Sequence, residues 1–487
     1  MEWSRYNHLF DSRRFGFFLY NALSNTLLEL DEAHYRALEE MRGRGGAEQG
    51  GGPAADPGFA ALLIERAVLV GAGDEERAIL ARRYERKAVC FNTARLALTV
   101  CPTLACNFRC PYCFEASQGD AAVMSPDTIA ALIAFIARHE DARALTLSWY
   151  GGEPTLAWHV IEEVTGRVQA LDITFEHAGL VTNGYLLDAA RIARLNDLRI
   201  RSIQITLDGP PEVHDRRRVL AGGGATYARI LENVGALMES RYEGACSIRV
   251  NIDKHNAERF IELRSDLLER FAGKKLHVYP GHVNTSLGGS YDHACSIDLD
   301  GWTQFTVDLY HQARVLPREG FHPAGRLHGV CTATRHNGFV VGPRGELYKC
   351  WEDVGRSEMA IGNVHEEEPI TGPGLRALYV LGTDAYTDPE CLACAVLPIC
   401  GGGCAGKRLR TRHFGEEGLA FCSPYKEHLT AYLEEYYHAF RRREMCAAVL
   451  TPGPVAGNTR GYRVVSPQPR REKGETAAVL DPFAEGV

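Results

Sequence analysis

The fifteen cysteines of this chain constrain its fold more than any other feature, because most of them stand in two clusters at short spacings. Free cysteines are usually buried small hydrophobes, and this suits the scattered Cys90, Cys246 and Cys446. The N-terminal residues carry no apolar segment of signal-peptide length, so we expect a cytosolic chain with reduced thiols rather than a disulfide framework. The clustered cysteines therefore predict metal sites.

The first cluster is a loop of spacing C-x3-C-x2-C formed by Cys106, Cys110 and Cys113. Three thiolates from one loop can hold three irons of a cubane iron–sulfur cluster and leave the fourth iron open. A structural zinc site would need a fourth ligand, and commonly a C-x2-C pair on each side. Cys101 lies outside this spacing and is expected to be a core residue.

Strands and helices alternate along the middle of the chain, from about residue 95 onward. The expected strands are 96–100, 144–149, 173–181, 202–207, 246–252 and 275–279, and the expected helices are 126–139, 158–170, 187–196, 226–240 and 256–272. Such alternation predicts a parallel sheet of βα units, and six units predict a partial (β/α)6 barrel. We therefore expect an α/β core over residues 93–320, with its chemistry at the C-terminal ends of the strands.

The first 92 residues predict a small α+β unit ahead of the barrel. The expected strands are 14–20, 26–30 and 67–71, and the expected helices are 32–41, 59–66 and 74–87. Six glycines between residues 43 and 52 predict a flexible loop over 43–58. After residue 445 the chain is rich in Pro, Gly and Arg, which predicts a poorly ordered tail over 445–487.

The second cysteine cluster lies in a glycine-rich region of little periodicity, over residues 325–430. Its seven members are Cys331, Cys350, Cys391, Cys394, Cys400, Cys404 and Cys422. A region without a regular hydrophobic pattern needs another source of stability, and metal clusters would supply it. By spacing alone a zinc-ribbon module stays open, since C-x2-C pairs also suit zinc.

Three phrases of the sequence, CNFRCPYCFE, YGGEPTL and ITLDGPPEVHDRRR, resemble the radical S-adenosylmethionine (SAM) superfamily, and in particular its peptide maturases. The resemblance implies a 4Fe–4S cluster on the first three cysteines, with the open iron chelated by SAM. One electron then cleaves SAM, and the resulting 5′-deoxyadenosyl radical abstracts a hydrogen atom from the substrate. The cofactor performs this chemistry, and the protein positions it and excludes water.

The same resemblance implies a set of SAM-binding residues at the strand ends. They are Tyr112 near the adenine, Gly151, Gly152, Glu153 and Pro154 at the SAM ammonium, then Thr182, Asn183 and Asp208. Taken without the resemblance, the Gly-Gly-Glu-Pro and Asn-Gly segments would be simple turns. Arg249 and Asn251 are weaker candidates that suit equally well as polar residues inside the barrel.

The second cluster resembles the SPASM extension, which implies two auxiliary 4Fe–4S clusters. By position, the outer cluster would use Cys391, Cys394, Cys400 and Cys422, and the inner one Cys331, Cys350 and Cys404. The fourth ligand of the inner cluster is open, either Cys295 or an iron met by substrate. Beside a radical SAM core, this interpretation is favoured over zinc.

The N-terminal unit over residues 1–92 resembles the winged-helix element with which many peptide maturases bind a leader peptide. Such a module adds an extended peptide to a sheet edge. A structural cap is the alternative for this unit.

We therefore expect an enzyme that matures a ribosomally made peptide, with a thioether or carbon–carbon crosslink as the product. The resemblance also implies an electron donor such as a flavodoxin or ferredoxin. The alternatives are a formylglycine-generating sulfatase maturase, which would need a carboxylate base, and a non-catalytic metal-binding scaffold. The net charge of −8 does not favour nucleic acid, and no apolar run approaches the roughly 18–20 residues of a membrane helix.

Overall fold

The computed structural model describes most of the chain. The described residues are 1–44, 56–117, 121–283, 295–315, 320–323, 331–450 and 461–465, and the side chains of 443–450 are not described. Most of the expected glycine-rich loop and most of the expected tail lie outside these ranges. None of the described helices is both long and apolar enough to cross a membrane.

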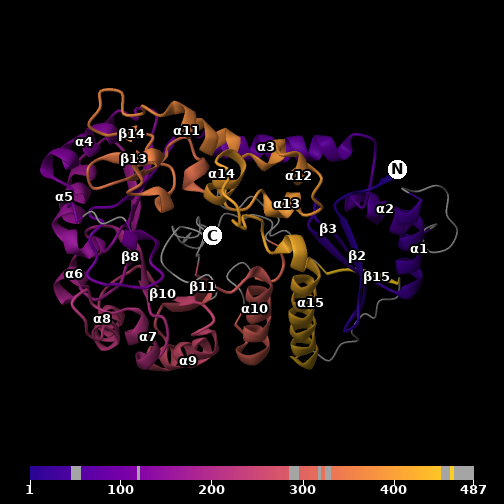
Figure 1. Cartoon of the computed structure of the whole chain (residues 1–487). Helices are drawn as coiled ribbons and strands as arrows, with labels where there is room; N and C mark the ends of the chain where they lie inside the picture. The colour runs from indigo at the N-terminus through magenta and orange to yellow at the C-terminus, as the bar shows by residue number, and fades with distance from the viewer. Residues whose placement is uncertain are drawn as a thin grey trace.

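A nine-stranded sheet forms the centre of the described structure, in the order β11-β10-β9-β8-β7-β6-β12-β13-β14 (Figure 1). The strands β6 to β11 are mutually parallel, as the alternation of strands and helices predicted. Their bounds are β6 Arg95–Val100, β7 Ala144–Trp149, β8 Thr174–Thr182, β9 Ile200–Thr206, β10 Ala245–Ile252 and β11 Leu276–His282. The expected partial barrel of six units is therefore confirmed.

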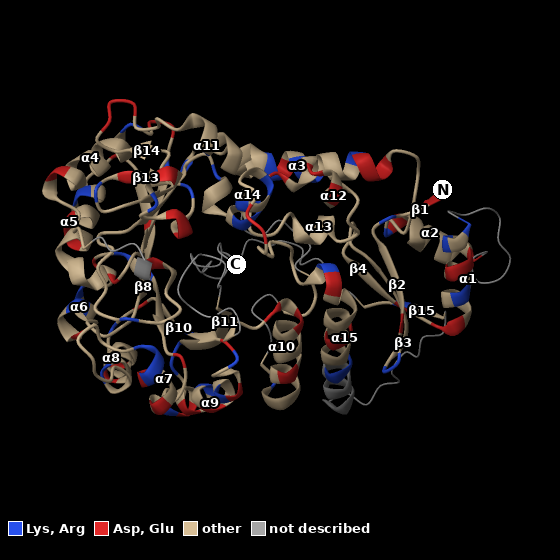
Figure 2. Cartoon of the chain, in the orientation of Figure 1, with Lys and Arg blue, Asp and Glu red and all other residues tan. Residues whose placement is uncertain are grey.

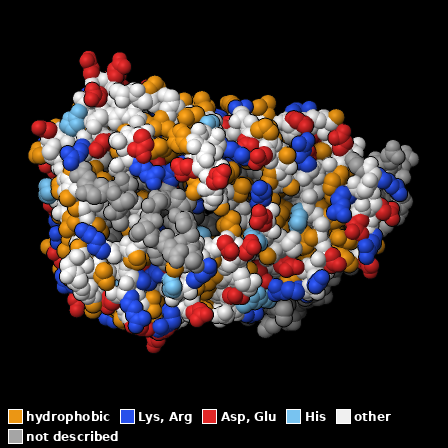
Figure 3. Space-filling model, in the orientation of Figure 1, with side chains coloured by type: hydrophobic (Ala, Val, Ile, Leu, Met, Phe, Trp, Pro, Cys, Tyr) orange, Lys and Arg blue, Asp and Glu red, His pale blue; other side chains and the backbone are white. Residues whose placement is uncertain are grey.

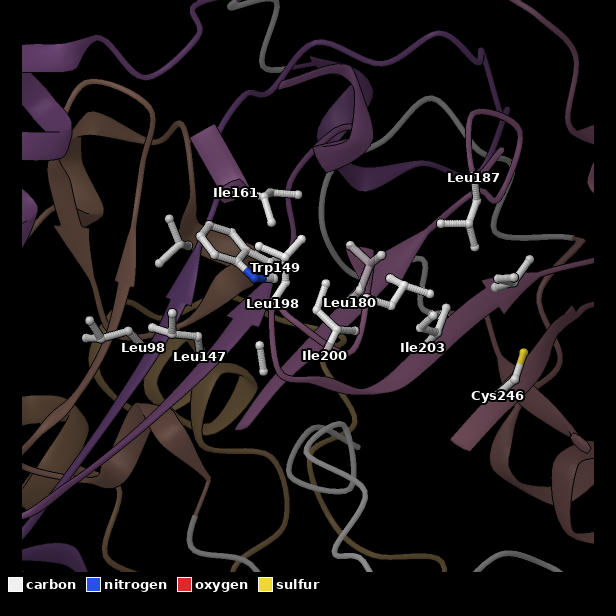
Figure 4. Packing of buried hydrophobic residues seen from close by; sticks show 14 of the residues in the cluster. Leu98, Leu147, Trp149, Ile161, Leu180, Leu187, Leu198, Ile200, Ile203 and Cys246 are labelled. Atoms are coloured by element: carbon white, nitrogen blue, oxygen red, sulfur yellow. The ribbon is translucent and has the colours of Figure 1, made fainter. Parts of the chain in front are cut away.

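Helices cover the outer face of these strands and lie in the connections between them, with α7 and α8 both in the connection from β9 to β10. They are α4 Pro126–Ala137, α5 Trp158–Val168, α6 Ala189–Arg194, α7 Pro211–Arg217, α8 Tyr227–Glu239 and α9 Phe260–Arg270. Ser125 caps α4 and Asp188 caps α6, each accepting a backbone N–H in the first turn. Between helices and sheet lies the main core, in which Trp149, Leu180 and Ile203 are fully buried (Figure 4).

Three strands of the second cysteine region extend the same sheet, which the sequence pattern did not predict. They are β12 Gly338–Val341, β13 Glu346–Tyr348 and β14 Gly362–Asn363, and β12 pairs in parallel with β6. Besides 3-10 and π-helical turns and loops, the rest of this region contains short α-helices: α11 Pro373–Ala377, α12 Pro389–Leu392, α13 Leu397–Cys400 and α14 Ala405–His413. The second cysteine cluster is thus built directly onto the barrel edge.

The N-terminal unit has a four-stranded antiparallel sheet, in the order β15-β4-β3-β2, with a two-stranded ribbon β1-β5 beside it. Its elements are β1 Glu2–Trp3, β2 Asn7–Ser12, β3 Gly16–Asn21, β4 Thr26–Leu30, α1 Glu32–Gly43, α2 Pro57–Glu65, β5 Leu69–Val70 and α3 Asp74–Cys90. The expected strands at 14–20 and 26–30 correspond to β3 and β4. Strand β2 was missed, because the sequence NHLFDS alternates only weakly between apolar and polar residues.

The helix α3 connects the N-terminal unit to the cysteine-rich region (Figure 1). Arg83 and Lys87 of α3 both form ion pairs with the buried carboxylate of Asp384, at 3.0 and 3.4 Å. The helices α10, Leu299–Ala313, and α15, Tyr425–Leu450, lie between the barrel and the N-terminal sheet. On the face shown in Figure 3, the described Lys and Arg side chains are interspersed with Asp and Glu.

The expectation of a poorly ordered tail over 445–487 is wrong for part of this range. Helix α15 continues to Leu450, and Tyr462–Val464 form β15, which pairs antiparallel with β4. Apolar side chains are the physical reason: Val465 is fully buried, and the Tyr462 ring packs 4.6 Å from that of Phe59. The composition of the surrounding residues concealed this short apolar segment.

Candidate active site

The C-terminal ends of the parallel strands meet at one edge of the barrel, and predicted site residues follow β6, β7, β8 and β9. The cysteine loop follows β6, Gly151 to Pro154 follow β7, and Asn183 follows β8. Asp208 comes shortly after β9, and Asp253 directly after β10. Since this edge is where barrel enzymes carry out their chemistry, these segments define the candidate site.

Cys106, Cys110 and Cys113 lie close together and are only partly exposed. Burial raises the pKa of Cys106 to about 12, and the neighbouring thiols of Cys110 and Cys113 add to that rise. Burial likewise raises the pKa of Cys113 to about 11. Three neutral thiols gathered in this way fit a site whose metal drives their deprotonation, because metal binding displaces the protons.

The Gly-Gly segment after β7 contacts the backbone of the cysteine loop too closely for any side chain. A Cβ on Gly152 would lie 2.4 Å from the carbonyl oxygens of Leu104 and Ala105. Gly151 has φ +114°, and a Cβ there would lie 2.5 Å from the carbonyl oxygen of Thr103. Glycine is therefore required at both positions, and it brings this backbone against the loop that carries the cysteines.

Glu153 is buried, with 1% of its surface exposed, and its carboxylate joins the ends of β7 and β8. Oε1 accepts hydrogen bonds from the Thr155 N–H and hydroxyl and from the Thr182 hydroxyl at 2.7 Å, and Oε2 accepts from the Asn183 N–H at 2.7 Å. Burial raises the pKa of Glu153, and these donors oppose the rise. The expected contact of Glu153 with the SAM ammonium stays a prediction, and Oε2 has room for one further donor.

Tyr112 and Asp208 are brought together inside the barrel. The Tyr112 hydroxyl donates to Asp208 Oδ2 at 2.5 Å and accepts from Arg218 at 2.7 Å and from the Asn251 amide at 3.2 Å. Burial raises the pKa of Tyr112 well above its usual value, so the phenol remains protonated. The residue expected near the adenine therefore also holds the cysteine loop to the ends of β9 and β10.

Sequence reasoning missed the charged residues that complete this network. Arg217, buried, donates to Asp208 at 3.2 Å and to Asp253 at 2.6 Å, and its guanidinium lies 5.1 Å from the centre of the Tyr112 ring. Asn256 donates to the Asp208 carbonyl oxygen at 2.7 Å. Two sequence features could have indicated these residues: the run of three arginines from Arg216 to Arg218, and the aspartate directly after β10. Both lie near strand ends.

The two weaker candidates on β10 also lie at this network. Asn251 donates its backbone N–H to Asp208 at 3.3 Å, and Arg249 donates to the Asn251 amide oxygen at 2.8 Å. A Cβ on Gly281 of β11 would lie 2.5 Å from Arg249 Nε, so a glycine there leaves room for the guanidinium. The barrel interior beside the strand ends is thus polar and basic.

The three cysteines assigned to the inner auxiliary site lie near one another. Burial raises the pKa of Cys350 well above its usual value, and the thiols of Cys331 and Cys404 add to the rise. Gly406 lies two residues after Cys404, and a Cβ on Gly406 would lie 3.4 Å from Cys350 Sγ. Cys295, the candidate fourth ligand, instead has its sulfur 3.0 Å from His255 Nε2. An inner site of three protein thiols is what the described residues offer.

The four cysteines assigned to the outer site are also grouped. Burial raises the pKa of Cys422, and the thiols of Cys400 and Cys391 add to the rise, while Cys394 donates its N–H to the Cys391 carbonyl at 3.0 Å. These grouped thiols fit a 4Fe–4S cluster.

One buried guanidinium contacts all three segments that carry the outer cysteines. Arg408, 2% exposed, donates to Cys391 Sγ at 2.7 Å and to the Gly402 carbonyl oxygen at 3.2 Å. It also pairs with Asp388 at 2.6 Å and lies 4.8 Å over the ring of Phe421, the residue before Cys422. A cation in this position offsets the negative charge of clustered thiolates.

Comparisons with known proteins agree with this geometry. Residues 100–267 match the model of the Radical SAM superfamily. A serine-type anaerobic sulfatase-maturating enzyme of Klebsiella aerogenes is 25% identical over 328 residues, which cover 62% of this chain and 77% of that protein. A cysteine-type anaerobic sulfatase-maturating enzyme of Clostridium perfringens is 21% identical over 362 residues, covering 68% and 95% respectively.

Among solved structures, anSMEcpe with bound AdoMet and Cp18Cys peptide matches at a TM-score of 0.55 and 19% identity, and the match covers 73% of this chain and 100% of that one. This likeness shows a shared fold. The superfamily match covers residues 100–267 and assigns that part of the chain to a radical SAM domain, which implies a 4Fe–4S cluster and SAM as cofactors. The curated proteins it is similar to are sulfatase-maturating enzymes.

Proposed function

We propose that this enzyme matures a ribosomally made peptide in the cytosol by removing a hydrogen atom from one of its residues, after which a thioether or carbon–carbon crosslink forms. The observation that carries the proposal is the separate N-terminal unit, which α3 joins to the cysteine-rich region. Small sheets capture extended peptides through main-chain hydrogen bonds at an edge. Such capture would tether the substrate near the barrel and raise its local concentration.

In this proposal Cys106, Cys110 and Cys113 hold the SAM-cleaving cluster, and the surrounding strand ends bind SAM. With both groups bound, the site would supply a 5′-deoxyadenosyl radical, formed by one-electron cleavage of SAM, for abstraction of the hydrogen atom. Gly151 and Gly152 bring their backbone close to the cysteine loop. The buried network of Tyr112, Asp208 and Arg217 then keeps that loop in place and limits water access.

We further propose that the two groups of cysteines beyond residue 330 hold two auxiliary 4Fe–4S clusters. The grouped thiols and the buried Arg408 support this assignment. These clusters would accept the substrate electron after hydrogen abstraction, and a flavodoxin or ferredoxin would supply electrons for SAM cleavage.

Sulfatase maturation is the second candidate, favoured by the names of the curated relatives. It would need a carboxylate base near the abstracted hydrogen. Glu153, Asp208 and Asp253 near the strand ends are already hydrogen-bonded to protein donors, and burial raises the pKa of Glu115 to about 8, so that this carboxyl is protonated near neutral pH. None of these four groups is singled out by its contacts as the base that sulfatase maturation would need.

The test is anaerobic incubation of the reconstituted enzyme with a short peptide encoded beside its gene, followed by mass spectrometry. A crosslink and the oxidation of serine to formylglycine both remove two hydrogen atoms, so fragmentation and carbonyl labelling separate them. A crosslink suppresses fragmentation between the joined residues, whereas formylglycine is an aldehyde that reacts with a hydrazide probe. Deleting residues 1–92 should leave slow, uncoupled SAM cleavage and the iron content intact, and modification of the full precursor should fall steeply. Equal modification by the truncated enzyme would make this unit a structural cap.

A further inference from the structure

The edge of β4 that could accept a peptide is already occupied by the chain itself. Residues 461–465 lie antiparallel to β4, with Tyr462 opposite Leu30 and Val464 opposite Leu28. The Asp31 N–H donates to the Gly461 carbonyl at 2.8 Å, and the Val465 N–H donates to the Leu27 carbonyl at 2.9 Å. These contacts reproduce, within one chain, the way in which a sheet captures an extended peptide.

Two side chains anchor this strand. The Tyr462 ring lies 4.6 Å from that of Phe59 on α2 and 5.4 Å from that of His34 on α1. Val465 is fully buried, and its carbonyl accepts a hydrogen bond from the Tyr436 hydroxyl of α15 at 2.8 Å. The sequence requirement is therefore an aromatic residue followed three positions later by an aliphatic one.

The residue before these anchors is fixed by backbone geometry. Gly461 has φ +78°, and a Cβ there would lie 2.3 Å from a carboxylate oxygen of Asp31 and 2.5 Å from the His34 ring. A glycine is thus the residue that lets the chain enter beside the start of α1. The segment 461–465 therefore matches the β4 edge at its glycine and at both anchor residues.

The position between the anchors is permissive. Arg463 pairs in register with Glu29, so the two side chains lie on one face of the sheet. That face borders a hollow of about 600 Å³ lined in part by Arg14, Glu29, Tyr437 and Arg441. Figure 2 shows Lys or Arg toward both ends of α15, and Arg441 and Arg442 are the ones that line this hollow. The Arg463 guanidinium lies 5.0 Å from the centre of the Phe440 ring of α15, a partly exposed contact that we expect to matter less than the two anchors.

The strand can leave without disturbing the rest of the sheet. Among the described strands β15 pairs with β4 alone, and it lies at the end of the sheet order. Residues 451–460 tether it to α15, and a short tether gives an effective concentration on the order of millimolar. A free peptide must therefore compete with a strand that is always present.

We propose that the β4 edge is a binding surface for an extended peptide carrying an aromatic residue and an aliphatic residue three positions later, and that residues 461–465 are an internal occupant which such a peptide displaces. If the enzyme matures peptides as proposed above, its precursor is the natural competitor. The internal strand then sets a minimum affinity for peptide binding, because peptides that bind weakly cannot displace it.

The probe is a fluorescent peptide of residues 458–468, whose binding to the full chain is followed by anisotropy. Val465→Pro removes the N–H that bonds to Leu27, and Tyr462→Ala removes the aromatic anchor. Either variant should bind the peptide at least about tenfold more tightly than the native chain, since the edge is freed. Val464→Ala, at a 37% exposed position, is the matched control and should behave like the native chain.

Peptide variants give the second arm of the test. A probe with Ala in place of Tyr462 should lose most of its affinity for the Val465→Pro chain, and a probe with Ala in place of Arg463 should retain it. Equal binding by native chain and both variants, or no binding to variants that still unfold cooperatively, would overturn the proposal. Because the probe is the chain's own sequence, this result is independent of whether a precursor peptide exists.

Discussion

The hydroxyl of Tyr112 donates a 2.5 Å hydrogen bond to the carboxylate of Asp208, joining the middle of the cysteine loop to the end of β9. The loop thereby depends on a side chain about a hundred residues further along the chain. Arg217, on the same carboxylate, extends the connection to Asp253 and β10. The position of the cysteine loop is thus tied to the C-terminal ends of β9 and β10.

Replacing Tyr112 by Phe tests this connection. The variant removes a hydrogen bond to a charged partner, worth about 1.5–3 kcal/mol, and the loop becomes less well held. We expect 5′-deoxyadenosine formation under dithionite to fall by roughly tenfold to a hundredfold, with the iron content unchanged. Tyr185→Phe is the control, because that ring packs on Phe108 of the same loop at 5.8 Å. A Tyr112→Phe enzyme with the native rate would contradict the account.

The iron content of the reconstituted protein reports how many clusters it holds. Ten assigned cysteines in three groups predict roughly twelve irons per chain after anaerobic reconstitution, four per cubane cluster. Replacing Cys106, Cys110 and Cys113 together by Ala should leave about eight irons and abolish 5′-deoxyadenosine formation. Colorimetric iron analysis measures this directly. About four irons in the intact protein would mean that the second cysteine region binds no clusters.

Arg408 predicts a change in redox potential. Its hydrogen bond to Cys391 Sγ stabilises negative charge on the sulfur and raises the potential of a cluster bound there. Arg408→Met should lower one auxiliary potential by about 60 mV, a tenfold change for one electron, or lower the iron content by about four. Potentiometric titration followed by EPR gives the value.

Arg412 offers a matched control for that experiment. It contacts the same Asp388 at 3.2 Å and lies 5.5 Å over the same Phe421 ring, but its side chain is 31% exposed and no described contact joins it to a cysteine sulfur. Arg412→Met should leave both iron content and potentials unchanged. Equal effects of the two substitutions would mean that Arg408 acts through general packing rather than through Cys391.

The sequence predicted the barrel and the grouping of its cysteines well, for a physical reason. Strands that alternate with helices of regular length indicate βα units, and thiol spacing within a loop is a local property. The network around Asp208 was harder to predict, because Arg217 and Asn251 come together only when different strands are placed side by side. Local patterns do not encode such contacts.

A buried histidine gives the protein a predictable response to acid. Burial lowers the pKa of His322 to about 4, although its hydrogen bond to the Pro323 carbonyl opposes the change. In the unfolded chain the imidazole has a pKa of about 6.5, so the unfolded state takes up a proton first as the pH falls. The stability contributed by the neutral ring is present above pH 6.5 and is lost as the pH falls toward 4, by up to about 3 kcal/mol.

His322→Phe should therefore flatten the pH dependence of unfolding. Between about pH 7 and pH 5, the apparent melting temperature of the native chain should fall further than that of the variant. His159→Gln, at an exposed position on α5, is the control and should follow the native chain. Identical pH profiles for His322→Phe and the native protein would refute this role for His322.

The C-terminal strand shows where composition misleads. A window rich in Pro, Gly and Arg predicts disorder, yet five residues within it, 461–465, pair with β4 from the far end of the chain. Burial of Tyr462 and Val465 outweighs the composition of their neighbours. A strand this short can be predicted from the sequence only when the sheet edge with which it pairs is known.

The most direct test of the account follows the hydrogen atom from peptide to cofactor. The enzyme is incubated anaerobically with SAM, dithionite and a precursor peptide deuterated at its carbon atoms, and the 5′-deoxyadenosine is analysed by mass spectrometry. The account predicts 5′-deoxyadenosine that carries deuterium from the peptide, formed together with a modified peptide. Unlabelled 5′-deoxyadenosine in the presence of a bound, fully deuterated precursor would contradict it.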